Sequence, residues 1–212
     1  MINLTTIYLM RHSEPFKIHL GSEDVNESLL FSNIKTPLSI NGEKLAEKIS
    51  NSNEFDHIDV VWSSNYVRAM STAKYFAFRN NVKVNISDRF GERIHGINSW
   101  SELPENFERE QLIDENYKID NGESQKEVKE RMLKAINKIL KDSKDKRILI
   151  VSHATAISFL LKNWCDISIE YDKLKYTYKD NILLHEYLNY CETFKLEFDE
   201  DNLLNIKKIN FN

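Results

Sequence analysis

The stretch Thr6-Ile-Tyr-Leu-Met-Arg-His12 lies close to the start of the chain and decides the fold. Its first five residues predict a buried strand, and a guanidinium and an imidazole follow where that strand ends. A second stretch, Arg147-Ile-Leu-Ile-Val-Ser-His153, has the same form. As parallel members of one sheet, the two strands would bring both histidines to its carboxyl edge, where open α/β sheets bind ligands.

Strand patterns and helix patterns alternate outward from these two stretches. Further strands are predicted at Ile58–Trp62 and Val82–Ile86, and two more, Glu192–Phe198 and Leu203–Ile209, predict a closing hairpin at the sheet edge. Helices are predicted at Ser39–Asn51, at Asn65–Phe78, from Ser124 to about Lys141 and at Ala154–Trp164. This order predicts a three-layer α/β/α sandwich with a mostly parallel central sheet.

The composition indicates one globular domain and excludes several classes of function. With 212 residues, of which 41% are hydrophobic, a single domain spanning 1–212 is expected. The net charge is -4 and the basic residues are scattered, so no nucleic-acid partner is expected. No apolar run approaches the roughly 20 residues that cross a bilayer, so no membrane partner is expected either. Two cysteines outside any paired motif and the lack of a signal peptide predict a cytoplasmic location.

Two long segments, about 13–36 and 97–121, fit neither the strand period nor the helix period. Loops of this length in a compact domain are usually lids or binding loops, so both are predicted to cover a site and to set its specificity. Lys17, His19 and Lys35 are candidate substrate contacts in the first segment.

A second arginine is expected to join the two histidines. Arg68 lies one turn into the helix that follows the strand ending at Trp62, and Arg11 directly precedes His12. Two guanidiniums and two imidazoles at one edge make a site for a tetrahedral oxyanion such as a phosphoryl group. The same positive charges would disfavour protonation of His12 and keep one of its ring nitrogens nucleophilic.

With these residues in place, the sequence resembles the histidine phosphatase superfamily, a group with the phosphoglycerate mutase-like fold. Six blocks in the family's order carry the resemblance: Leu9-Met-Arg11-His12-Ser-Glu14, Pro37-Leu-Ser-x-x-Gly42, Ser63-Ser64-x-x-x-Arg68-Ala69-x-x-Thr72-Ala73, Glu92 followed by Gly96, Gly122-Glu123-Ser124 and Val151-Ser152-His153. Together they span most of the chain, which makes the joint signal strong where each block alone is weak.

The resemblance implies a role for each matched residue. His12 would be the nucleophile that becomes phosphorylated, and Glu92 would donate a proton to the leaving oxygen and later take one from water. Arg11, Arg68 and His153 would bind the phosphoryl oxygens. The partner would be a small phosphorylated metabolite, with no metal and no cofactor involved.

The sequence departs from the family's pattern at several positions beside these residues. Ser13 stands in place of the usual Gly, Asn65 in place of Pro, Ser71 in place of Gln, and Ala154-Thr155 in place of a Gly pair. None of these changes removes a charged group of the site. They bear on loop geometry and on the shape of the substrate.

Three functions remain open: a phosphatase, a phosphoglycerate mutase that uses the same phosphohistidine, and a non-catalytic module that binds a phosphorylated ligand. Arg93, which follows Glu92, leans towards the mutase, and His95 is a candidate for lining the pocket. Residues 101–123 hold eight acidic side chains against two basic ones and would repel a phosphoglycerate, which favours the phosphatase. The sequence does not decide the oligomeric state.

Overall fold

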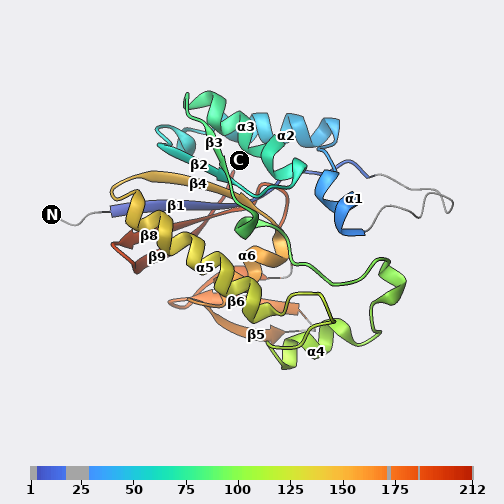
Figure 1. Cartoon of the computed structure of the whole chain (residues 1–212). Coiled ribbons are helices and arrows are strands. Elements are labelled where there is room, and N and C mark those ends of the chain that lie inside the picture. The colour runs from blue at the N-terminus through green and yellow to red at the C-terminus, as the bar shows by residue number, and fades with distance from the viewer. Residues whose placement is uncertain (1–3, 18–28, 171–172, 186, 212) are drawn as a thin grey trace.

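A computed structural model describes residues 4–17, 29–170, 173–185 and 187–211, and it places a six-stranded sheet at the centre of the molecule (Figure 1). The sheet order is β3-β2-β4-β1-β8-β9. Its strands are β1 (Leu4–Arg11), β2 (Val60–Ser63), β3 (Val84–Ile86), β4 (Arg147–Ser152), β8 (Thr193–Asp199) and β9 (Asn202–Ile209). The first four strands in this order are parallel, whereas β8 runs antiparallel to β1 and β9 antiparallel to β8. The predicted parallel sheet and closing hairpin are both confirmed.

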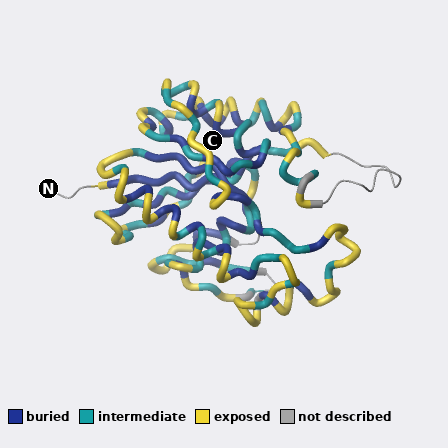
Figure 2. The backbone as a smooth tube through the Cα atoms, viewed as in Figure 1, coloured by how far each residue is buried: buried dark blue, intermediate teal, exposed yellow. Residues whose placement is uncertain are grey.

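Alternation along the strands gives the sheet two apolar faces. In β1, Ile7 and Leu9 face one buried cluster, whereas Tyr8 and Met10 face the other. Helices α5 (Gln125–Asp142) and α6 (Ala154–Leu161) cover the first face, and helices α2 (Ile40–Ser50) and α3 (Val67–Arg79) cover the second (Figure 1). The buried central strands between exposed helix surfaces in Figure 2 confirm the three-layer arrangement.

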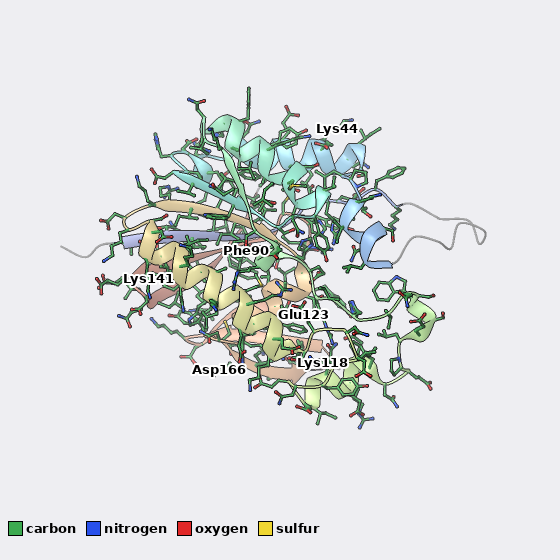
Figure 3. The ribbon with its side chains drawn as sticks, in the orientation of Figure 1. Lys44, Phe90, Lys118, Glu123, Lys141 and Asp166 are labelled. Carbon is green, nitrogen blue, oxygen red and sulfur yellow. The ribbon has the colours of Figure 1, made fainter. Side chains whose placement is uncertain are left out.

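Helix α5 begins where its capping residues predict. Ser124 Oγ accepts a hydrogen bond from the Glu127 amide at 3.2 Å, and Glu127 Oε2 accepts one from the Ser124 amide at 2.9 Å. One face of the helix is buried, through Val128, Met132, Ala135, Ile136, Ile139 and Leu140. Phe90, which is labelled in Figure 3, is fully buried in the same cluster.

Two of the predicted helices are shorter than expected. Helix α6 ends at Leu161 rather than Trp164, because the chain then turns, with the Trp164 and Cys165 amides both donating to the Leu161 carbonyl. Helix α3 begins at Val67 rather than Asn65, because Tyr66 has extended backbone angles and forms its N-cap.

Several elements have no counterpart in the sequence prediction. Helices α1 (Leu29–Lys35) and α4 (Phe107–Ile113) lie in the two segments predicted as lids, and each has only seven residues, too few for a clear period. Short 3-10 turns lie at Asn53–Phe55, Asp88–Phe90 and Trp100–Glu102. A second, antiparallel sheet contains β5 (Asp166–Glu170), β6 (Lys173–Tyr178) and β7 (Asn181–His185). It extends the first face of the core through Tyr176, Leu183 and Leu184.

The candidate contacts of the first lid segment are only partly located. Lys17 is exposed, and Lys35 is exposed at the end of α1. His19 lies outside the described residues.

The buried face of α5 is expected to contribute strongly to stability. Ile136→Ala, at a position with no solvent exposure, should lower the free energy of unfolding by about 2 to 5 kcal/mol, because it leaves a cavity between helix and sheet. The matched control is Lys134→Ala on the exposed face of the same helix, which should change it by less than about 0.5 kcal/mol. Urea titration followed by circular dichroism measures both. Equal effects would contradict the assignment of this face to the core.

Candidate active site

The two histidines meet at the carboxyl edge of the sheet, as the sequence predicts. Strands β1 and β4 are parallel neighbours in which Arg11 pairs with Ser152, so His12 and His153 each follow at the same level. The His12 amide donates to the Ser152 carbonyl at 2.9 Å. The ring centroids lie 5.0 Å apart in an edge-on arrangement, and both rings are buried.

Arg68 joins the two imidazoles. It lies in the first turn of α3, and only 5% of its surface is exposed. Its Nε donates to His12 Nε2 at 3.0 Å and its Nη2 donates to His153 Nδ1 at 3.1 Å. The third nitrogen, Nη1, donates to the carbonyl of Asn33 in α1 at 2.5 Å. One buried guanidinium therefore bridges both rings and a helix of the first lid segment.

The hydrogen-bond partners fix the tautomer of each ring. His12 Nδ1 lies 2.6 Å from the Ser13 carbonyl oxygen, which can only accept, so Nδ1 carries the proton and Nε2 keeps a free lone pair. His153 accepts from Arg68 at Nδ1, so its Nε2 carries the proton and donates to Ser64 Oγ at 2.7 Å. Both rings are thus held in fixed orientations, with His12 Nε2 unprotonated.

Burial and neighbouring charge keep both imidazoles neutral. The pKa of His12 lies well below 6.5, chiefly because of burial, with Arg68 and Arg11 lowering it further against the opposing bond to Ser13. The pKa of His153 is also well below its usual value, first through burial and then through His12 and Arg68. The sequence analysis explained the unprotonated state of His12 by nearby positive charge. In the structure, burial makes the larger contribution to its lowered pKa.

Arg11 reaches the site from the end of β1 and is held by the connection between β7 and β8. Its Nη1 donates to the Leu188 carbonyl, and its guanidinium lies 4.4 Å from the centre of the Tyr190 ring. The Tyr190 ring is also 6.3 Å from that of His12. The sequence analysis did not predict Leu188 or Tyr190 as site residues, because neither belongs to a motif with a recognised chemical role.

Glu92 lies near the same rim, and its carboxylate bonds to backbone amides rather than to either imidazole. Its Oε1 accepts from the amides of Ala156 at 3.0 Å and Arg93 at 2.9 Å, and its Oε2 accepts from the Thr155 amide at 3.3 Å. These amides include the first turn of α6, the helix that starts directly after His153. The charge of Glu92 raises the pKa of Arg68, against the larger effect of burial, so the two groups lie within electrostatic reach.

Arg131 of α5 holds the loop that carries Glu92. Its Nη1 donates to the Arg89 carbonyl at 2.7 Å, and its Nη2 donates to the carbonyls of Gly91 at 3.1 Å and Glu92 at 3.2 Å. The Glu123 carboxylate orients it by accepting from Nε at 2.6 Å and from Nη2 at 3.0 Å. Glu123, labelled in Figure 3, precedes the first residue of α5 by two positions. The sequence analysis named Glu123 only as part of the stretch Gly122-Glu123-Ser124, and it did not predict Arg131 as a site residue.

Ser13, one of the departures from the family pattern, fits the local geometry. Ser13 is fully buried, its Oγ donates to the Gly42 carbonyl at 2.7 Å, and its amide donates to Thr72 Oγ1 at 2.9 Å. Gly42 has no room for a side chain, because a Cβ there would lie 2.1 Å from the Glu14 carbonyl oxygen. Ser13 therefore holds the loop after His12 against helices α2 and α3.

Arg93 and His95 pack against side chains of the second lid segment. Arg93 is buried, with Nε donating to the Glu123 carbonyl at 3.0 Å, another nitrogen donating to Gln111, and the Phe107 ring 4.5 Å away. His95 contacts the Trp100 ring at 5.1 Å, and burial followed by the charge of Arg93 lowers its pKa to about 4. Both residues stabilise α4 and the loop before it.

These groups have the composition of a tetrahedral oxyanion site on an open α/β sheet. The sequence profile of the histidine phosphatase superfamily (branch 1) matches residues 7–192, and the chain belongs to this family. Phosphoserine phosphatase 1 of Hydrogenobacter thermophilus is 30% identical over 127 residues, which cover 55% of this chain and 58% of that relative. The family and this relative support a phosphatase enzyme.

Solved structures share the fold. The native mycobacterial glucosyl-3-phosphoglycerate phosphatase is similar over 99% of both chains, with a TM-score of 0.65 and 15% identity. Bacillus stearothermophilus YhfR is similar over 94% of both chains, with a TM-score of 0.67 and 20% identity. A phosphoserine phosphatase mutant of Entamoeba histolytica bound to phosphoserine is similar over 96% of both chains, with a TM-score of 0.64 and 18% identity. Among the described residues, no helix is both long and apolar enough to cross a membrane.

The buried neutral histidines predict a dependence of stability on pH. Their pKa values are lowered in the folded chain, so as pH falls through 6.5 the unfolded chain takes up protons that the folded chain does not. The free energy of unfolding should therefore fall between about pH 7 and pH 5. Urea titrations across this range measure the slope. His153→Gln, with one imidazole fewer, should show a smaller slope, and an unchanged slope would contradict the prediction.

Arg131 is expected to act on catalysis through the position of Glu92. Arg131→Lys keeps the positive charge but loses the planar fork that binds several carbonyls, so kcat should fall about tenfold or more. The inhibition constant of inorganic phosphate should change far less, because the residues predicted to bind phosphate, Arg11, Arg68 and His153, lie outside this loop. Lys138→Ala, which removes an exposed ion pair on the same helix, is the control. A parallel loss of phosphate binding would instead indicate general damage to the site.

Proposed function

We propose that this chain is a phosphatase that hydrolyses a small phosphomonoester through a phosphohistidine on His12, with Glu92 as general acid and base. The observation that carries the proposal is the unprotonated Nε2 of His12, buried and 3.0 Å from the Nε of Arg68. A neutral imidazole nitrogen beside guanidinium donors is suited to attack on phosphorus.

The first half-reaction transfers the phosphoryl group to the enzyme. His12 Nε2 attacks phosphorus in line, the bond from phosphorus to the ester oxygen breaks, and Glu92 in its protonated form gives its proton to that oxygen. Arg68 moves its Nε hydrogen bond from His12 to a phosphoryl oxygen. Arg11, Arg68 and His153 offset the charge on the phosphoryl oxygens in the transition state.

The second half-reaction releases inorganic phosphate. Glu92, now ionised, takes a proton from water as the water oxygen bonds to phosphorus and the bond to His12 Nε2 breaks. His12 returns to its neutral state, in which Nδ1 remains bonded to the Ser13 carbonyl. No step in this sequence calls on a metal or a cofactor.

The substrate is proposed to be a small phosphorylated metabolite. The relative and two of the similar structures are phosphatases named for phosphoserine or glucosyl-3-phosphoglycerate, which are small phosphomonoesters. The chain matches only 58% of the length of the phosphoserine phosphatase relative, so its specificity is not carried over. The single domain over 1–212 and the cytoplasmic location stay predictions.

The surroundings of Arg93 favour the phosphatase over the mutase. Arg93 was the residue that leaned towards a mutase, yet its guanidinium is committed to Gln111, the Glu123 carbonyl and the Phe107 ring. With only 2% of its surface exposed, Arg93 is a poor partner for the carboxylate of a phosphoglycerate. A non-catalytic binding module is disfavoured, because such a module has no use for an oriented nucleophilic nitrogen.

The proposal predicts a phosphorylated intermediate on His12. Rapid quenching with a radiolabelled phosphomonoester should trap an acid-labile phosphoenzyme in the wild type and none in His12→Ala, whose turnover of p-nitrophenyl phosphate should fall by about a thousandfold or more. Glu92→Gln should bind inorganic phosphate but form the intermediate slowly. The control is His57→Ala, which removes an exposed histidine. If His12→Ala kept the activity of the wild type, the mechanism would be wrong.

A further inference from the structure

A cavity of about 310 Å³ lies beside Glu92. Leu30 and Ile34 of α1 line one wall, Asn65 and Tyr66 line a second, and Asp88 and Arg89 of the short turn before Glu92 line a third. This volume is at the lower end of the range for small-molecule sites. The cavity therefore has room for a small metabolite.

Tyr66 and Glu92 connect this cavity with the reacting groups. The Tyr66 ring lies 4.6 Å from the ring of His153 and 4.9 Å from the guanidinium carbon of Arg68, and it also lines the cavity. Under the proposed function, Glu92 protonates the oxygen that leaves phosphorus. Because Glu92 itself lines the cavity, the alcohol part of the substrate extends from that oxygen into it.

Some of the charged side chains that line the cavity are already paired with each other, and others are not. Arg131 and Glu123 also line it, but they pair with each other and with the backbone of the Glu92 loop. Asp88 and Arg89 are exposed, and neither side chain has an ion pair or hydrogen bond with another described residue. One carboxylate and one guanidinium are therefore available to a ligand.

Polar and apolar groups flank these two charges. The Oδ1 atom of Asn65 has no hydrogen-bond partner within the described ranges, in a chain where most buried polar atoms have one. Leu30 and Ile34 supply an apolar wall. The Asn33 carbonyl of α1 accepts a hydrogen bond from Arg68, so this wall is linked to the side chain that bridges the two histidines.

We infer that the cavity selects a phosphorylated amino acid, a small phosphomonoester whose alcohol part carries an ammonium and a carboxylate. Asp88 pairs with the ammonium group and Arg89 with the carboxylate, while the Asn65 amide adds a polar contact beside them. Leu30 and Ile34 cover the short carbon chain. This inference rests on the proposed function and assigns the specificity of the same site to residues outside the anion pocket.

The experiment compares substrates that lack one charge at a time. The probes are phosphoserine, phosphoethanolamine without the carboxylate, phosphorylated hydroxypropanoate without the ammonium, and p-nitrophenyl phosphate with neither. The wild type should show a kcat/KM for phosphoserine about tenfold above that for either single-charge analogue. Inorganic phosphate release measures all of them.

Two variants that each remove one charge then test the assignment. Asp88→Asn should reduce the preference for phosphoserine over phosphorylated hydroxypropanoate about tenfold, and Arg89→Gln should reduce its preference over phosphoethanolamine by a similar factor. Lys83→Gln, an exposed charge outside the cavity, should leave both preferences as in the wild type.

The outcomes separate this inference from the proposed function. If Asp88→Asn and Arg89→Gln lower kcat/KM equally for every probe, the two residues act only on the Glu92 loop and the inference is overturned. A wild type without preference for phosphoserine overturns it as well. In both cases turnover of p-nitrophenyl phosphate through His12 would leave the proposed function standing, whereas no turnover of any probe would contradict both.

Discussion

The guanidinium of Arg68, shared between two buried imidazoles, is the interaction on which the rest of the site depends. A buried cation is tolerated only when its donors have partners, and here the three nitrogens find His12, His153 and the Asn33 carbonyl. This arrangement requires β1 and β4 to be parallel neighbours and α3 to begin close to their carboxyl ends. The strand order of the sheet is therefore what brings Arg68 and the two histidines together.

Burial of these groups also sets their protonation. Both rings are almost completely buried, and the nearby guanidiniums oppose a further positive charge, so the pKa of each histidine is lowered. The Ser13 carbonyl then selects which nitrogen of His12 carries the remaining proton. The Ser13 carbonyl and Arg68 together fix the orientation of the His12 ring, so Nε2 is the nitrogen that faces the Arg68 guanidinium.

Glu92, the proposed acid and base, is held by a different part of the framework from His12, the proposed nucleophile. Glu92 is held by the first turn of α6 and, through its loop, by Arg131 of α5, whereas Arg68 comes from α3 on the opposite face of the sheet. The cavity beside Glu92 lies where residues of both layers and of α1 meet. The Glu92 loop with its cavity and the two histidines with Arg68 are thus held by separate sets of contacts around one rim.

The sequence by itself determined the parallel sheet, the hairpin and the gathering of Arg11, His12, Arg68 and His153, because strand period, caps and motifs are local signals. Only the tertiary structure decided the second sheet, the short helices α1 and α4, and the parts played by Tyr190 and Arg131. Those contacts join residues far apart in the chain, as Arg131 does with the Glu92 loop. Arg93 shows the same limit, since its position beside Glu92 in sequence did not reveal that its side chain is buried against α4. The period of a segment fixes which face it buries, but not which distant side chain that face meets.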